Sequence, residues 1–156
     1  MKNILITGGA GFIGSNLALG LIAKGHKITV LDNLSTQIHG ENPNVTSPLY
    51  KSIKDKVTFI NGTVTSRVDW EKAIANQDVI VHFAAETGTG QSMYCIEKYT
   101  EVNIQGTAIM LDILANQKHQ VKKVVIASSR SIYGEGKYIH PELGAVYPKH
   151  RVESNM

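Results

Sequence analysis

The sequence is poor in cysteine and in net charge. Cys95 is the single cysteine, which excludes an internal disulfide and is typical of a reducing compartment. The formal net charge is only +3 and the basic residues are scattered, so we expect neither a nucleic-acid nor a membrane partner. The six histidines have no metal-ligand spacing, and we therefore predict no metal site.

Long apolar runs are also missing. No apolar segment is long enough to cross a bilayer, and the first one is interrupted at once by glycines. We therefore expect no membrane span and no signal peptide, which favours a cytoplasmic protein. The 156 residues are enough for one globular domain with a sizeable core.

The most informative segment is the glycine-rich stretch 7–14, TGGAGFIG. It follows the apolar run 4–6 and precedes apolar residues at helical spacing, which predicts a strand, a tight turn and a helix. In a dinucleotide-binding turn, Gly8 permits the bend, Gly11 lets a pyrophosphate approach the backbone, and Gly14 allows close helix packing. The helix N-terminus then offers free N–H groups to phosphates. A purely structural turn is the alternative, and the missing Gly-Lys-Ser/Thr argues against a P-loop.

An acidic residue, Asp32, ends the next predicted strand, near the distance at which a carboxylate accepts hydrogen bonds from an adenosine ribose. A carboxylate there would repel a 2′-phosphate, so NAD is favoured over NADP. The alternative for Asp32 is a helix or turn cap.

Strands alternate with helices along the chain, which predicts an α/β fold with a doubly wound parallel sheet of strand order 3-2-1-4-5. We expect residues 36–52 to form a loop, with one helical turn at most, and residues 130–156 to form a long loop. The expected strands are 2–7, 27–32, 57–61, 78–85 and 122–129, and the expected helices are 11–24, 68–75 and 96–116.

Five segments together resemble the extended short-chain dehydrogenase/reductase family, in its NAD-dependent nucleotide-sugar epimerase/dehydratase branch. They are TGGAGFIG at 7–14, DNL at 32–34, HFAA at 82–85, Asn103 before Gly106-Thr107, and SSRSIYG at 128–134. The resemblance implies a Rossmann-like NAD-binding domain over 1–136, whereas 137–156 would lead into a catalytic helix and a substrate region that this chain lacks. The segments 87–93 and 128–136 most resemble a subgroup acting on nucleotide-activated deoxy sugars or hexoses.

The resemblance also assigns roles to individual residues. Ser129 would hydrogen-bond the substrate oxygen that is oxidised, and Ser92 would contact the substrate. The family commonly has Asp at the position of Thr63, which leaves the main chain of Val64 for the adenine. The implied NAD-binding residues are Gly8, Gly11, Phe12, Ile13, Gly14, Asp32, Asn33, Leu34, Ser35, Thr63, Val64, Phe83, Ala84, Ala85, Thr87, Asn103 and Ser128.

The family's chemistry needs a Tyr-x-x-x-Lys pair on one helix, in which the lysine lowers the tyrosine pKa. Tyr133 and Lys137 match by spacing, but two intervening glycines make a poor helix. Tyr147 has Arg151 in the lysine position, and arginine does not readily replace lysine. We therefore expect the chain to be inactive alone.

The resemblance thus implies the NAD-binding half of a nucleotide-sugar 4-epimerase or dehydratase, working through a transient 4-keto intermediate. A truncated, non-catalytic NAD-binding module or redox sensor is the alternative, and an NADP-dependent reductase is disfavoured by Asp32. We interpret His82 as a packed strand residue rather than an acid or base, and Trp70 as core. Members of this family form homodimers through the helix that matches 96–116, so the resemblance implies a possible homodimer through this helix.

Overall fold

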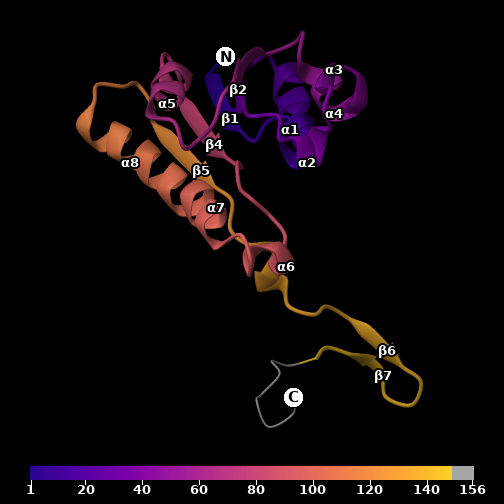
Figure 1. Ribbon diagram of the computed structural model, residues 1–156. Helices are drawn as coiled ribbons and strands as arrows, with labels where there is room; N and C mark the ends of the chain where they lie inside the picture. Colours follow the sequence, from indigo (N-terminus) through magenta and orange to yellow (C-terminus); the bar gives the residue numbers. More distant parts are fainter. Residues whose placement is uncertain (149–156) are drawn as a thin grey trace.

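The computed structural model describes residues 1–148, and its centre is a five-stranded sheet (Figure 1). The strand order is β3-β2-β1-β4-β5 and all four pairings are parallel, which confirms the predicted sheet. Thr7 at the end of β1 pairs with Leu31 on one side and His82 on the other. The strands are β1 Asn3–Thr7, β2 Lys27–Asp32, β3 Thr58–Asn61, β4 Val79–His82 and β5 Lys123–Ile126.

Helices cover the two faces of this sheet, because successive strand residues point to opposite sides. In β1, Ile4 and Ile6 face a cluster that includes Ala18 of α1 (Phe12–Ala23). Leu5 between them faces the other cluster, with Trp70 of α5 (Arg67–Ile74) and Met110 of α8 (Gly106–Asn116). Figure 1 shows α1 on one side of the strands and α5 with α8 on the other. Trp70 is fully buried, which confirms its assignment to the core.

The segment after β2 is more ordered than the sequence predicted. Instead of a loop with one helical turn, it forms α2 (Thr36–His39), α3 (Pro43–Thr46) and α4 (Pro48–Ile53). Proline begins two of these helices, where its missing N–H is no cost, and Ser47 caps α4 by accepting from the Tyr50 amide. Such four- to six-residue helices carry too little periodicity to be seen in sequence.

The predicted helix 96–116 exists but is not uniform. It consists of α7 (Ile96–Thr100), a π-helical turn η1 (Glu101–Gln105) and α8. π-helical turns are rare and often occur at functional sites. Here the turn carries Asn103, whose side chain is hydrogen-bonded to the Glu86 main chain.

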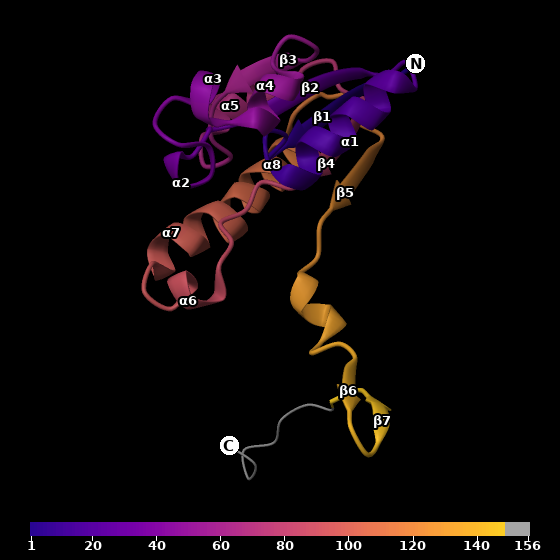
Figure 2. The same ribbon diagram turned by 90° about the vertical axis from the view of Figure 1, so that its right-hand side faces the viewer.

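The C-terminal part differs from the predicted long loop. β5 ends at Ile126, so Ser128 and Ser129 follow the strand instead of ending it. A 3₁₀ turn, η2 (Arg130–Tyr133), then leads to a two-stranded hairpin of β6 (Tyr138–His140) and β7 (Gly144–Val146). Figure 2 shows this hairpin projecting away from the sheet. Within residues 1–148, no helix has both the length and the apolar character that crossing a membrane would require.

Candidate functional site

The glycine turn after β1 is shaped by close backbone contacts. Gly8 has φ +65°, and a Cβ atom there would lie 2.8 Å from the Ala84 amide nitrogen. A Cβ atom at Gly14 would lie 2.4 Å from the Gly8 carbonyl oxygen, so α1 packs on the turn itself. Among residues 1–148, apart from the two adjoining residues, a Cβ atom at Gly11 would meet the Gly8 carbonyl oxygen alone within 4 Å, at 3.3 Å. The absent side chain at Gly11 thus leaves the outer side of the turn accessible.

The N-terminus of α1 presents main-chain donors at this turn. The first bond of the helix runs from the Ser15 amide to the Gly11 carbonyl at 3.0 Å. The amides of Phe12, Ile13 and Gly14 therefore precede the helical ladder and have no acceptor within the helix. The Phe12 and Ile13 side chains are exposed. Together with the helix dipole, these amides form a site suited to an anionic group.

The Asp32 carboxylate lies beside this turn and holds it. Its Oδ2 accepts from the Ala10 amide and its Oδ1 from the Leu34 amide, both at 2.9 Å. The alternative role as a turn cap is therefore real, but it does not use the whole carboxylate. An ionised carboxylate has about four acceptor positions, and two remain for a ligand hydroxyl. His39 Nε2 approaches Oδ1 to 3.9 Å from the buried side of α2.

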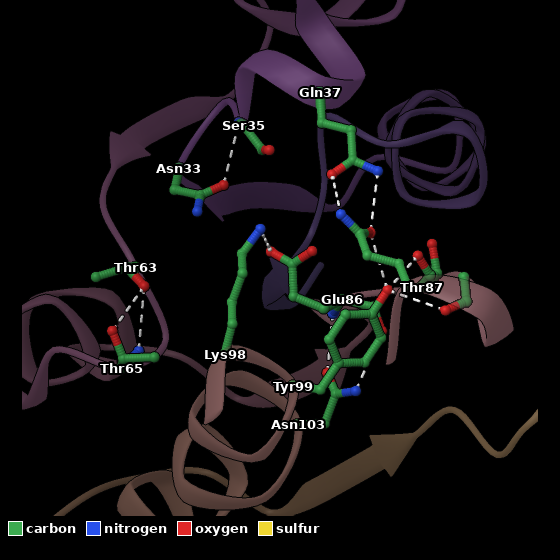
Figure 3. Close-up of polar contacts among 12 residues, drawn as sticks. Asn33, Ser35, Gln37, Thr63, Thr65, Glu86, Thr87, Lys98, Tyr99 and Asn103 are labelled. Atoms are coloured by element: carbon green, nitrogen blue, oxygen red, sulfur yellow. Dashed lines mark hydrogen bonds and ion pairs between the residues drawn. The ribbon is translucent and has the colours of Figure 1, made fainter. Parts of the chain in front are cut away.

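The residues after Asp32 form a tight turn at the mouth of the site. Asn33 Oδ1 accepts from the Ser35 amide at 3.2 Å (Figure 3), and Leu34 adopts φ +51°. Asn33 is exposed and Ser35 half-buried. Both remain available next to Asp32 for contact with a ligand.

Thr63 and Val64 follow β3, and the structure separates their roles. The Thr63 amide donates to Asp69 Oδ2 at 3.1 Å. The Val64 side chain is buried in the core, and its carbonyl accepts from Trp70 Nε1 at 2.8 Å. The side chain of Val64 therefore does not line the site, which leaves its amide as the group that could contact a ligand.

A buried chain of hydrogen bonds links β1, β4 and α8. Thr7 Oγ1 accepts from the Phe83 and Ala84 amides at 3.2 and 3.1 Å, so its hydroxyl hydrogen is directed to His82 Nδ1 at 2.6 Å. His82 Nε2 lies 3.1 Å from Thr107 Oγ1. Burial lowers the pKa of His82, so the ring is neutral near pH 7. These contacts confirm that His82 is a packed, hydrogen-bonded strand residue.

The segment 86–92 after β4 is held by side chains from α7 and η1 (Figure 3). Asn103 Oδ1 accepts from the Glu86 amide at 2.9 Å, and Asn103 Nδ2 donates to the Glu86 carbonyl at 3.1 Å. Lys98 Nζ lies 3.0 Å from Glu86 Oε1. The Tyr99 hydroxyl donates to the Thr87 carbonyl at 2.8 Å. Desolvation and then the nearby Glu86 carboxylate raise the pKa of Tyr99, which keeps its hydroxyl a donor.

The predicted site residues thus fall into two groups, one at the carboxyl edge of the sheet and one, of Ser92, Ser128 and Ser129, in α6 (Thr89–Ser92) and after β5. The glycine turn, Asp32–Ser35, Phe83–Thr87 and Asn103 meet at the carboxyl edge of the sheet, where ligands of open α/β sheets bind. Ser92 lies in α6 and donates to the Thr89 carbonyl at 2.7 Å. Ser128 and Ser129 are exposed in the segment between β5 and η2.

Comparison with known proteins identifies the family of this chain. Residues 4–151 match the model of the NAD dependent epimerase/dehydratase family. The chain belongs to this family. It is 36% identical over 152 residues to a dTDP-L-rhamnose 4-epimerase of Burkholderia thailandensis, covering 96% of this chain and 40% of that protein. A bifunctional UDP-glucose and UDP-xylose 4-epimerase of Arabidopsis thaliana is 32% identical, with 88% and 39% covered.

Solved structures of family members agree. A UDP-glucose 4-epimerase from Bifidobacterium longum, in complex with NAD+ and UDP, superposes with a TM-score of 0.69 and 29% identity, over 85% of this chain and 38% of that one. A UDP-glucose 4-epimerase from Thermus thermophilus, in complex with NAD, gives 0.67 and 28%, over 81% and 37%. The chain therefore spans about 40% of the length of the curated relatives that it matches.

The tyrosine pairs expected to be poor candidates for the family's chemistry can now be placed. η2 ends at Tyr133, which is 87% exposed. Gly134 and Gly136 follow with φ +70° and +88°, so Tyr133 and Lys137 do not share a helix. The second pair, Tyr147 with Arg151, extends beyond the described residues.

Sequence reasoning missed several residues that build the site. Asp69 follows Ser66 by three positions, a spacing that indicates the observed cap in which Ser66 accepts from the Asp69 amide, but not the bond from the Thr63 amide to the Asp69 carboxylate. Tyr99 was also missed, although it lies four residues before the predicted Asn103, a helical spacing that places both on the face toward segment 86–92. Lys98 carried no signal of its own, and Thr107 belonged to a recognised segment that did not indicate its contact with His82.

Proposed function

We propose that this chain is the NAD-binding part of a nucleotide-sugar 4-epimerase or dehydratase that works through a transient 4-keto intermediate. The observation that carries the proposal is the pairing of the α1 N-terminus with the Asp32 carboxylate across one turn. An anion site next to a carboxylate matches the pyrophosphate and ribose of a dinucleotide. Relatives that are nucleotide-sugar 4-epimerases support the choice of reaction.

The residues of this chain fit the parts of NAD in sequence along the sheet edge. The amides of Gly11 to Gly14 would hold the pyrophosphate, and Asp32 with Asn33 would hold the adenosine ribose. The adenine would lie near Thr63 and the main chain of Val64. Bound NAD would supply a hydride acceptor and donor for the sugar C4 carbon.

The nicotinamide end would lie along the loop after β4. Phe83, Ala84, Ala85 and Thr87 would line it, and Asn103 would position it through the Glu86 main chain. Ser128 would lie near the cofactor, Ser129 would hydrogen-bond the substrate oxygen, and Ser92 would contact the sugar. A nucleotide-activated sugar is the substrate class that fits these relatives, and a cytoplasmic location fits the single cysteine.

Calorimetric titration of the 156-residue chain with NAD and with NADP tests the cofactor. We expect NAD to bind at least about tenfold more tightly, because a 2′-phosphate would meet the Asp32 carboxylate. Asp32→Ala should weaken NAD binding, while Asp55→Asn in the exposed turn after α4 should leave it unchanged. Equal affinity for both cofactors would contradict the assignment of Asp32.

A second candidate is an NAD-binding module without turnover, or a redox sensor. The observation that favours it is the separation of Tyr133 and Lys137, which the 3₁₀ turn and two left-handed glycines keep off a common helix. The two candidates differ in a simple assay with dTDP-L-rhamnose or UDP-glucose and added NAD. Turnover by the 156-residue chain would exclude the second candidate. Binding without turnover is expected of both, and a Tyr-x-x-x-Lys pair found downstream in the native gene product would then favour the first.

We also propose that the chain forms a homodimer through the helix 96–116. Its outer face exposes apolar side chains, with Ile96 65%, Ile104 66% and Leu111 50% exposed. Burying such side chains is favourable, and contiguous exposed apolar groups often mark interfaces. Sedimentation of the wild type and of Ile104→Glu tests this, and a monomeric wild type would contradict it.

A further inference from the structure

One contact joins two segments that lie on opposite sides of the glycine turn. α2 follows β2, segment 86–92 follows β4, and β1 lies between these strands in the sheet. A bond between α2 and segment 86–92 must therefore pass across the carboxyl end of β1, where the turn leads into α1. Gln37 of α2 and Gln91 of α6 form this bond, and we name the pair the glutamine bridge.

The glutamine bridge is reciprocal. Gln37 Nε2 donates to Gln91 Oε1 at 3.2 Å, and Gln91 Nε2 donates to Gln37 Oε1 at 3.3 Å (Figure 3). Each side-chain amide donates one hydrogen bond and accepts one, and the bridge carries no charge because both amides are neutral. The two residues are 54 positions apart, so it is the fold that brings them together.

The two halves of the bridge are held differently. Gln91 Oε1 also lies 3.0 Å from the Tyr99 hydroxyl, which in turn contacts the Thr87 and Gly88 carbonyls at 2.8 and 3.1 Å. The single hydroxyl hydrogen of Tyr99 is shared among these three acceptors, and Gln91 is the half-buried member of the pair, in contact with α7. Gln37 is exposed on a four-residue helix. α2 is held by the buried His39, which is hydrogen-bonded to Ser47 at 2.8 Å, so opening should occur at the amide pair itself, by rotation of the exposed Gln37 side chain.

We propose that the glutamine bridge is a latch that spans the proposed cofactor site at the carboxyl end of β1 and slows the release of bound NAD. The proposal rests on the NAD binding proposed above, because the pyrophosphate would lie at the turn that the bridge spans. Release then requires the two amide bonds to break. Such bonds have a modest net strength in water, so their loss should speed release by about three- to tenfold.

Methionine variants test the latch with little change in side-chain length. The full 156-residue chain is loaded with fluorescent NADH and chased with excess NAD in a stopped-flow instrument. We expect Gln37→Met and Gln91→Met each to accelerate NADH release, with unchanged melting temperature. The double variant should release no faster than either single variant, because one bridge is lost in each case. Gln117→Met removes an exposed glutamine bond to Glu71 far from the site and is the matched control.

A charged replacement gives an independent readout. Gln37→Lys combined with Gln91→Glu converts the bridge into an exposed ion pair, which salt screens. Release from this variant should accelerate with added salt more than release from the wild type. An identical salt response in the two proteins would overturn the latch.

The remaining outcomes separate the latch from the proposed function. Release rates of both methionine variants within twofold of the wild type, or effects that multiply in the double variant, overturn the latch and leave NAD binding intact. A wild-type chain that binds no NADH overturns both. Faster release confined to Gln37→Met and Gln91→Met, with Gln117→Met unchanged, supports the latch.

Discussion

Replacing Asp32 by asparagine removes the charge from the group that holds the glycine turn. The carboxylate accepts one main-chain hydrogen bond on each oxygen, from Ala10 at 2.9 Å and from Leu34 at 2.9 Å. Asparagine keeps only one acceptor oxygen in this place. Its NH₂ group would have to face the second amide, so that two donors would oppose each other at an 8% exposed site.

The size of the effect follows from these two bonds. A hydrogen bond to a charged group contributes about 1.5–3 kcal/mol, and a neutral one about 0.5–1.5 kcal/mol. Asp32→Asn loses one charged bond and weakens the other, which predicts a loss of about 2–4 kcal/mol in the free energy of unfolding. For a domain of this length, that corresponds to a melting temperature lower by roughly 5–15 °C.

Thermal and urea unfolding followed by circular dichroism measure the change. Asp55→Asn is the control, because Asp55 is exposed in the turn after α4. A melting temperature of Asp32→Asn within about 2 °C of the wild type would refute the reasoning, since the per-kcal shift is at least that large. It would mean that the carboxylate does not hold the turn in solution.

Three further predictions concern the same site. Gly14→Ala should lower the free energy of unfolding by about 1–3 kcal/mol and weaken NAD binding, because its Cβ atom would lie 2.4 Å from the Gly8 carbonyl oxygen. Gly20→Ala in the same helix is the control: its Cβ atom would meet no atom of residues 1–148 within 4 Å, so it should stabilise the chain in thermal unfolding. Burial lowers the pKa of His82, so as the pH falls this histidine is protonated first in the unfolded state. The free energy of unfolding should therefore be constant above about pH 6.5 and fall below it, by up to about 1.4 kcal/mol per pH unit. Urea titrations at several pH values measure this slope, and His82→Gln should remove it. Asn103→Ala should speed amide hydrogen exchange in segment 86–92, because both bonds to the Glu86 main chain are lost, and unchanged exchange would contradict that anchoring.

Much of the fold could be predicted from the sequence. The buried parallel strands appear as short apolar runs, and their alternation with helices leaves few topologies, because parallel crossovers are right-handed. The predicted C-terminal ends of two strands were less accurate. β4 stops at His82 and β5 at Ile126, since the following residues turn toward the site or away from the sheet. The small helices of 36–53 and the hairpin of 138–146 are too short for periodicity to reveal.

The candidate site was predictable where a motif fixes the backbone. The glycines and Asp32 act through their own conformation and the strand end, both local in sequence. The main-chain role of Val64 stays a prediction. Its side chain lies in the core with Trp70 and Met110 of α8, and no local pattern indicates that packing. The contact of Asn103 has no local signal either, because the Asn103 side chain bonds to Glu86, which lies 17 residues earlier in the chain.

By itself, the sequence determined the parallel sheet, the glycine turn and the carboxylate beside it, because these follow from local backbone freedom and apolar periodicity. Only the tertiary structure decided which side chains meet across that edge. Thr7 with His82 and Gln37 with Gln91 are 75 and 54 residues apart. No local pattern specifies such pairs, since their distance depends on the sheet order and on how helices pack against it.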